Sequence, residues 1–192
     1  MVWLKQRTNI EYTNYMTEQI VLAGGCFWGM EELFRAQAGV VDTEVGYTGG
    51  YGDHPTYENP LGHAEALRIS YDPSQTTLAT LLDYFFRIHD PTTINRQGND
   101  IGESYRSAIF YIDDAQRGAA KQAIERAQTH WSSRIVTTLE ALTEFYVAED
   151  HHQDYLQNTL VDIPAITNGI LTISRGKSLL FATLVSSKCK AR

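Results

Sequence analysis

QIVLAGGCFWGMEELFRAQAG (residues 19–39) is the stretch that decides the fold, because it changes from a strand pattern to a helix pattern at a pair of glycines. Residues 19–23 form a short apolar run that predicts a buried strand. Residues from about 26 to 37 have helical spacing, and the pattern stops near Gly39. We therefore expect Cys26 at the first turn of a helix. Free backbone N–H groups and the positive end of the helix dipole lower the pKa of a thiol there.

Cys26 has two interpretations when its position is taken alone, a buried structural cysteine or a reactive thiolate. Its neighbours favour the second. On a helical projection Phe27 faces the core, whereas Trp28 lies with Glu31 and Glu32 on the polar side. A tryptophan on the polar side of a helix, next to a cysteine, indicates a binding surface, although single exposed aromatic residues are common.

The rest of the chain alternates strand and helix patterns. Strands are expected at 40–47, 64–71 and 105–112 and near 135–140, and helices from a cap at Ser74 to before Pro91, from Asp113 to about His130 and near 148–157. This mixture predicts an α+β protein, a two-layer α/β sandwich arranged as a ferredoxin-like plait with a mixed sheet and added helices. We divide the chain into an N-terminal arm (1–18), a folded domain (19–157) and a divergent tail (158–192).

Composition excludes several classes of function. The net charge of -7 disfavours binding to nucleic acid or to an anionic membrane. The sequence has no apolar run long enough for a transmembrane helix, and its first residues lack the apolar core of a signal peptide. Two cysteines do not suggest a disulfide framework. We expect a cytoplasmic monomer.

Metal and phosphate motifs are incomplete. The GKS at 176–178 has Leu171 where a phosphate-binding loop needs glycine. The HAE at 63–65 matches the first half of a zinc deaminase motif, but the downstream P-C-x-x-C is missing. No H-E-x-x-H is present. We therefore expect no metal and no cofactor.

Six stretches together resemble the A-type peptide methionine sulfoxide reductases. GCFWG followed by MEELF is similar to the signature of that family. The other stretches follow in the family's order: VGYTGGY, PTYEN, GHAEALRISYDP, HDPTTINRQGNDIGESYRSAIFY and FYVAEDHHQDYLQ. The resemblance covers roughly residues 20–157 and makes 19–157 a catalytic domain. It implies reduction of the S epimer of methionine sulfoxide, free or in oxidatively damaged proteins, to methionine.

By matching position, the resemblance assigns roles to seven residues. They are the nucleophile Cys26, the acid Glu65 that protonates the sulfoxide oxygen, Tyr57 and Tyr105 that hydrogen-bond this oxygen, the polar residue Asp100, and Phe27 and Trp28, which form an apolar pocket for the substrate methyl group. Taken alone, tyrosines and a loop aspartate are most often structural, and only the family match selects these.

The chemistry of Glu65 also follows from its strand. In 64–71 it shares a face with Leu67, Ile69 and Tyr71, where desolvation raises the pKa of a carboxyl group toward neutrality. A general acid needs such a pKa. The alternative is a glutamate at an exposed strand end. We expect His151 and His152 on a solvated helix.

Recycling of Cys26 is left open by the sequence. Reduction of the substrate leaves a cysteine sulfenic acid, and members of the family commonly carry a resolving cysteine near the C-terminus. This chain departs from the family after about Gln157, and Cys189 is its internal candidate, beside Lys188 and Lys190. Either Cys189 resolves the sulfenic acid or an external thiol does, and thioredoxin is the usual reductant of the family.

Two other hypotheses stay open at this point. One is an acyl-transfer enzyme that pairs Cys26 with a histidine. The other is a module that binds methionine-containing peptides without turnover.

Overall fold

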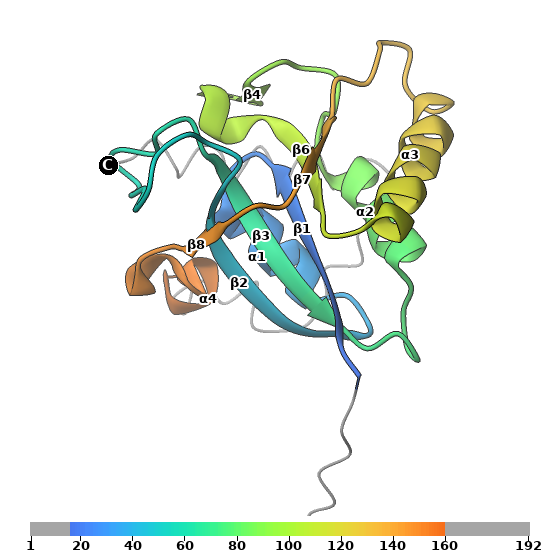
Figure 1. Cartoon of the computed structure of the whole chain (residues 1–192), viewed down its shortest axis with the longest axis horizontal. Coiled ribbons are helices and arrows are strands. Elements are labelled where there is room, and N and C mark those ends of the chain that lie inside the picture. Colours follow the sequence, from blue (N-terminus) through green and yellow to red (C-terminus); the bar gives the residue numbers. More distant parts are fainter. Residues whose placement is uncertain (1–15, 160–192) are drawn as a thin grey trace, which may run out of the picture.

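Six strands form the main sheet of the computed structural model, which describes residues 16–159 (Figure 1). They are β1 (Glu18–Gly24), β2 (Val40–Thr48), β3 (Ala64–Tyr71), β6 (Ser107–Tyr111), β7 (Thr138–Ala141) and β8 (Phe145–Val147). Their order across the sheet is β7-β6-β1-β3-β2-β8, with β6 and β7 parallel and the other neighbours antiparallel. A mixed sheet with helices confirms the predicted α+β class.

The main core lies between one face of this sheet and three helices, α1 (Phe27–Arg35), α2 (Leu78–Ile88) and α3 (Asp114–Gln128). Fully buried aromatic and aliphatic side chains fill it, among them Phe34 of α1, Phe85 of α2 and Leu67 of β3. Burying such side chains is the main source of folding free energy, at about 25 cal/mol per Å² of apolar surface.

The opposite face of the sheet carries mostly small side chains, such as Ala66 and Ala108, around Phe110. Leu142 and Phe145 pack on this cluster. Leu142 follows β7 and Phe145 begins β8, and the chain between these two strands crosses the sheet in front of β1 and β3 (Figure 1). One face therefore holds the large core, and the other is closed by a single crossing segment.

Short elements complete the described chain at one end of the sheet. They are a two-stranded hairpin of β4 (Arg96–Gln97) and β5 (Asp100–Ile101), the 3-10 helices η1 (Glu103–Tyr105) and η2 (Asp150–His152), and α4 (Tyr155–Thr159). The sequence patterns missed the hairpin and β8, because strands of two or three residues are too short to show a period.

Several predicted boundaries agree with the structure. The strand at 64–71 has the predicted bounds, and Asp113 caps α3 by accepting a hydrogen bond from the Gln116 N–H at 2.7 Å. The predicted cap at Ser74 is wrong. The N-cap of α2 is Thr77, because the Ser74 N–H and hydroxyl both bind the Asp72 carboxylate in a preceding turn.

Tyr105 was expected in a strand but lies in η1, and β6 begins two residues later. Gly102, with φ +150°, lets the chain enter this turn. Residues 1–15 of the predicted arm (1–18) and residues 160–192 of the predicted tail (158–192), including Cys189, lie outside the described residues. Within residues 16–159, no helix is long and apolar enough to cross a membrane.

Two glycines give opposite predictions for stability. An added Cβ at Gly118, inside α3, meets nothing within 4 Å, whereas one at Gly46 in β2 would lie 2.4 Å from the Tyr146 carbonyl oxygen. Gly118→Ala should raise the free energy of unfolding by about 0.5–1 kcal/mol, because alanine is the better helix former. Gly46→Ala should lower it by about 1–3 kcal/mol through overpacking. Denaturant titration measures both, and shifts of the same sign would contradict this description of the packing.

Candidate active site

Cys26 lies where β1 ends and α1 begins. It is the N-cap residue of α1, its carbonyl oxygen accepts the Met30 N–H at 3.3 Å, and its side chain is partly exposed. The chain reaches this position through Gly25, whose φ is +102° and whose added Cβ would lie 2.5 Å from the Gln97 side chain. The thiol therefore sits at the N-terminal end of α1, close to the position predicted from the sequence.

Glu65 is the buried carboxyl group next to this cysteine. Its Oε2 accepts a hydrogen bond from the Phe27 N–H at 3.0 Å, and 4% of the residue is exposed. Burial raises its pKa to about 8, the charge of Asp100 adds to the rise, and hydrogen bonds from the Phe27 N–H and Tyr105 act against it. The strand pattern thus placed Glu65 correctly on the core face, and the exposed alternative is wrong.

Tyr105 connects the groups that the sequence singled out. Burial raises its pKa above the ordinary range, and the charges of Glu65, Tyr57, Asp100 and Cys26 add to the rise. All five groups are therefore near enough to interact, although they come from the α1 N-cap, β3, the loop after β2, β5 and η1. A phenol with a raised pKa keeps its proton at neutral pH and can donate a hydrogen bond.

An aromatic cluster lies beside the cysteine. The Tyr57 ring stacks on Trp28, with centroids 6.0 Å apart and planes at 14°, and also on Phe27 at 6.4 Å. The Tyr155 ring of α4 also stacks on Trp28, with ring centroids 3.8 Å apart. Phe27 is fully buried and Trp28 is 6% exposed. Trp28 is thus not the exposed surface residue that its helical projection suggested.

His152 and Tyr155 are site residues that sequence reasoning missed. His152 is 3% exposed and accepts the Trp28 Nε1–H at 3.2 Å through its Nδ1. The expected solvated helix is therefore wrong for this residue, whereas the neighbouring His151 is exposed. The one available signal was the stretch FYVAEDHHQDYLQ, which the family match highlighted without pointing to individual residues.

Glu149 links this C-terminal segment to the loop that carries Tyr57. Its Oε1 accepts the Tyr57 N–H at 3.1 Å, and its Oε2 accepts the Tyr47 hydroxyl at 2.9 Å. Two buried or half-buried tyrosines from different elements are thereby fixed by one carboxylate.

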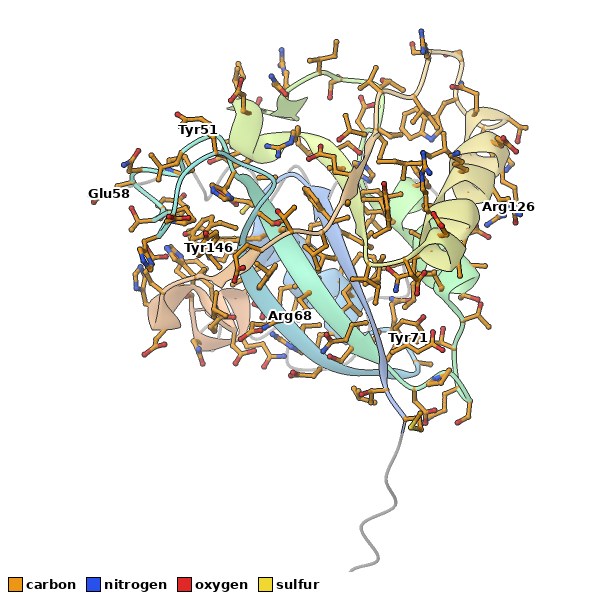
Figure 2. All side chains as sticks on the ribbon, in the orientation of Figure 1. Tyr51, Glu58, Arg68, Tyr71, Arg126 and Tyr146 are labelled. Atoms are coloured by element: carbon orange, nitrogen blue, oxygen red, sulfur yellow. The ribbon has the colours of Figure 1, made fainter. Side chains whose placement is uncertain are left out.

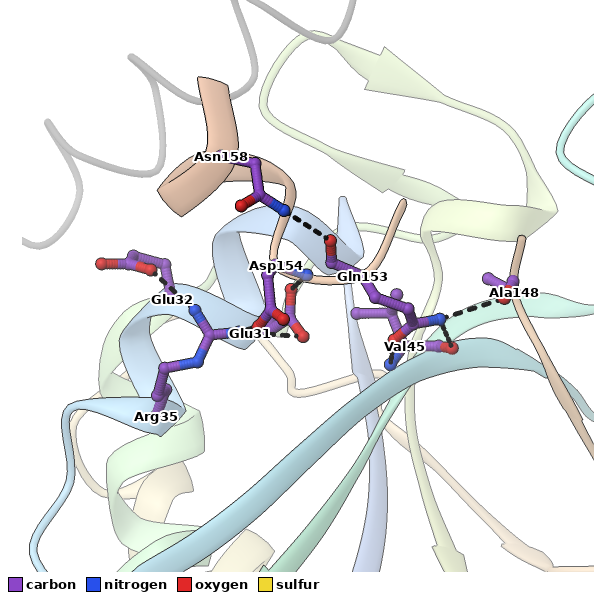
Figure 3. A network of polar contacts seen from close by, with 8 residues as sticks. All are labelled: Glu31, Glu32, Arg35, Val45, Ala148, Gln153, Asp154 and Asn158. Atoms are coloured by element: carbon purple, nitrogen blue, oxygen red, sulfur yellow. Dashed lines mark hydrogen bonds and ion pairs between the residues drawn. The ribbon is translucent and has the colours of Figure 1, made fainter. Parts of the chain in front are cut away.

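Polar contacts on α1 and β2 hold the segment 149–159 in place (Figure 3). The Gln153 side chain binds both the N–H and the carbonyl oxygen of Val45 at 3.0 Å. Glu31 accepts the Asp154 N–H at 3.0 Å, and Arg35 forms ion pairs with Glu31 and Asp154. The polar side of α1 predicted from the sequence is therefore covered, and Glu31 is only 1% exposed.

Comparisons with known proteins identify the family. The family model described as peptide methionine sulfoxide reductase matches residues 18–169. The peptide methionine sulfoxide reductase MsrA of Mycolicibacterium vanbaalenii is 58% identical over 142 residues, which cover 73% of this chain and 84% of the relative.

The chain belongs to the peptide methionine sulfoxide reductase family.

Solved structures agree with this assignment. Reduced Mxr1 from Saccharomyces cerevisiae matches with a TM-score of 0.73 and 39% identity, over 80% of this chain and 92% of that one. Mxr1 in complex with Trx2 matches with a TM-score of 0.55 and 34% identity, over 77% and 91%. The protein is thus an MsrA-type oxidoreductase. Membership favours sulfoxide reduction over the acyl-transfer and binding-module hypotheses.

Seven of the predicted site residues lie within one connected region, and the eighth, Cys189, falls outside the described residues. Cys26, Tyr57, Glu65, Asp100 and Tyr105 form a polar group, and the aromatic cluster begins at Phe27, the residue after Cys26. In residues 16–159, no group of three or more histidine, cysteine, aspartate or glutamate side chains is arranged to hold a metal ion.

Glu31 predicts a pH-dependent stability. Burial raises its pKa to about 7, with the Arg35 charge acting against this, so the folded reductase holds more protons than the unfolded chain between about pH 4.5 and 7. The free energy of unfolding therefore falls as pH rises through this window. Glu31→Gln should match the parent near pH 5 and become more stable than it near pH 8, by up to about 3 kcal/mol.

Urea titrations of both proteins at each pH measure this difference. Glu32→Gln is the matched control, because it removes the other Arg35 partner on α1, whose side chain is partly exposed at 28%, and solvent-accessible ion pairs contribute little. A difference that grows toward low pH would contradict the raised pKa.

Proposed function

We propose that this reductase converts the S epimer of methionine sulfoxide, in oxidised proteins and as the free amino acid, to methionine through a sulfenic acid on Cys26. The observation that carries the proposal is the Glu65 carboxyl group. It is buried, held by the N–H of the residue after Cys26, and has a pKa of about 8. At neutral pH it is largely protonated and can act as a general acid beside the thiol.

The chemical step follows from these groups. The Cys26 thiolate attacks the sulfoxide sulfur while Glu65 transfers a proton to the sulfoxide oxygen. The sulfur–oxygen bond of the substrate breaks, and the hydroxyl group ends on Sγ as a sulfenic acid. The substrate sulfur is reduced by two electrons and the cysteine sulfur is oxidised by two. Tyr105 and Tyr57 supply hydrogen bonds that stabilise the developing charge on oxygen.

Asp100 supports the acid rather than reacting itself. Its negative charge is one of the causes that raise the pKa of Glu65, so it favours the protonated form that the step requires. The family resemblance supports Phe27 and Trp28, whose ring centroids lie 6.2 Å apart, as the apolar contact for the substrate methyl group. If different side chains bind the sulfoxide oxygen and the methyl group, two of the three substituents at sulfur are fixed, and only one configuration directs the rest of the substrate outward. This arrangement supports selection of one epimer, and the family resemblance supports the S epimer.

Glu65→Gln should lower the first-turnover rate by roughly 10²–10⁴, the usual contribution of general acid catalysis. In the parent protein the rate should decline as pH rises through about 8, where Glu65 loses its proton, and the variant should lack this decline. The readout is methionine formed from S-sulfoxide with dithiothreitol in rapid-quench chromatography. The R epimer and Cys26→Ser should give no product.

Glu58→Gln is the matched control, because it changes an exposed glutamate on the same loop as Tyr57 (Figure 2). Its rate and pH profile should equal those of the parent. A Glu65→Gln rate within twofold of the parent would mean that another group donates the proton.

For recycling we propose a thioredoxin-class reductant, because the relative Mxr1 has been crystallised in complex with Trx2. Two routes remain, one through Cys189 and one in which the external thiol attacks the sulfenic acid directly. Each route releases the sulfenic oxygen as water and leaves a disulfide for thioredoxin to reduce.

Cys189→Ser separates the two routes. The first turnover should be unchanged, because Cys26 alone performs the reduction. If Cys189 resolves, one equivalent of sulfoxide should consume both thiols of the parent, and the variant should lose sustained turnover with thioredoxin. Thiol titration after one equivalent provides the measurement. Unchanged thioredoxin-driven turnover would assign resolution to the external thiol.

The remaining expectations stay predictions. A ferredoxin-like plait is supported by the order β6-β1-β3-β2, with α1 and α2 as the connections after β1 and β3. The domain boundaries, cytoplasmic location and monomeric state rest on the sequence alone.

A further inference from the structure

Arg106 is a side chain that the proposed chemistry does not use, yet it joins the segments that carry both phenols. Its Nη1 donates hydrogen bonds to the carbonyl oxygens of Gly62 at 3.1 Å and Glu103 at 3.0 Å. Its Nη2 donates to the carbonyl oxygen of Gly49 at 3.0 Å. The guanidinium thus satisfies three backbone acceptors, which suits the planar fork of arginine and not the single nitrogen of lysine.

These three carbonyl oxygens lie at the ends of the loop between β2 and β3 and at the start of η1. Gly49 and Gly62 stand at the two ends of the loop between β2 and β3, which carries Tyr57. Glu103 begins η1, which ends at Tyr105. The loop and η1 lie side by side above the end of the sheet (Figure 1), and the labelled Tyr51 marks the loop in Figure 2. One cation therefore fixes the loop ends to each other and to the turn.

The backbone is shaped to admit this cation. At Gly49, with φ +75°, an added Cβ would lie 2.7 Å from the Arg106 Nη2, so a larger residue would displace the guanidinium. Glu140 of β7 balances the charge, with its Oε1 3.8 Å from the Arg106 Nε. The side chain of Arg106 is only 14% exposed, although two of its backbone acceptors, Gly49 and Glu103, lie at the surface.

Arg106 is also fixed relative to Cys26. The next residue, Ser107, opens β6 and pairs with Gly24 of β1, two positions before the cysteine. A displacement of the guanidinium would therefore change where both phenols stand relative to the thiol.

We propose that Arg106 is a positioning residue that sets the places of Tyr57 and Tyr105 around the sulfoxide oxygen. The inference rests on the proposed roles of the two phenols. Arg106 itself touches neither the substrate nor a reacting atom. It acts by holding the loop after β2 and η1 at a fixed spacing, and a shift of about 1 Å in such groups can cost up to about 10²-fold in rate.

A spectroscopic experiment tests the positioning directly. 3-Fluorotyrosine is placed at position 57 or 105 of the full chain, and ¹⁹F spectra are recorded for the parent, Arg106→Lys and Arg106→Gln. Both resonances should shift or broaden in both variants. Arg126→Lys, which changes an exposed arginine paired with Asp83 on the α3 side, should leave them unchanged (Figure 2). Unchanged resonances in both Arg106 variants would overturn the proposal.

A kinetic experiment links this position to rate. At saturating S-sulfoxide, Arg106→Lys should lower the first-turnover rate by roughly 10-fold in the parent and by less than about 2-fold when Tyr57→Phe and Tyr105→Phe are already present. Its pH profile should keep the decline near pH 8, because the Glu65 acid is retained. Equal losses in both backgrounds would mean a general structural effect and overturn the proposal.

Failure of the proposed function gives a different result. If the two phenylalanine substitutions alone leave the rate at the parent value, the phenols have no role in the reaction. The ¹⁹F spectra then still decide whether Arg106 positions them, because that measurement needs no turnover.

Discussion

The hydrogen bond from the Phe27 N–H to the Glu65 carboxyl oxygen is the interaction on which the rest of the site depends. The N–H is one of the unsatisfied donors at the start of α1, and the acceptor is a carboxyl group buried on β3. Because Phe27 directly follows Cys26, this bond places the acid beside the thiol. The same hydrogen bond lowers the pKa of Glu65, whereas burial raises it, and the resulting pKa is about 8. At this value the carboxyl group is largely protonated at neutral pH and can still release its proton.

This hydrogen bond forms only if the end of β1 and the start of β3 lie side by side. The antiparallel register of β1 with β3, in which Leu22 pairs with Leu67, brings the end of one strand near Glu65. Gly25 then turns the chain into α1 without a side chain that would strike Gln97. The thiol and the acid are thus set by the sheet, whereas the phenols arrive on a loop and on η1. Elements without ladder hydrogen bonds need other supports, and Arg106 and Glu149 supply them through backbone groups.

The sequence predicted the parts of the site that depend on local patterns. Alternation in 64–71 placed Glu65 on the core face, and the glycine pair placed Cys26 at the start of a helix. It failed where a distant segment decides the environment. The face of α1 with Trp28 and Glu31 has a polar pattern, but residues 149–159 cover it through stacking and polar contacts. No periodicity within α1 contains that information, so His152 and Tyr155 were also missed. Thr77, rather than Ser74, caps α2 because Asp72 already engages Ser74.

Two buried carboxyl groups, Glu65 packed against the start of α1 and Glu31 within α1, each lower the stability of the fold once they ionise. Glu65 and Glu31 are both buried, both have raised pKa values, and both accept a backbone N–H from another element. Each carboxylate costs folding free energy once it ionises, since burial disfavours the charge. For Glu65 this cost is inseparable from its use as an acid, because the same desolvation that destabilises the anion keeps the proton available. Glu31 accepts the Asp154 N–H, and this hydrogen bond holds the segment that carries His152 and Tyr155 over Trp28. The aromatic side of the site is therefore maintained by a group that never approaches the substrate.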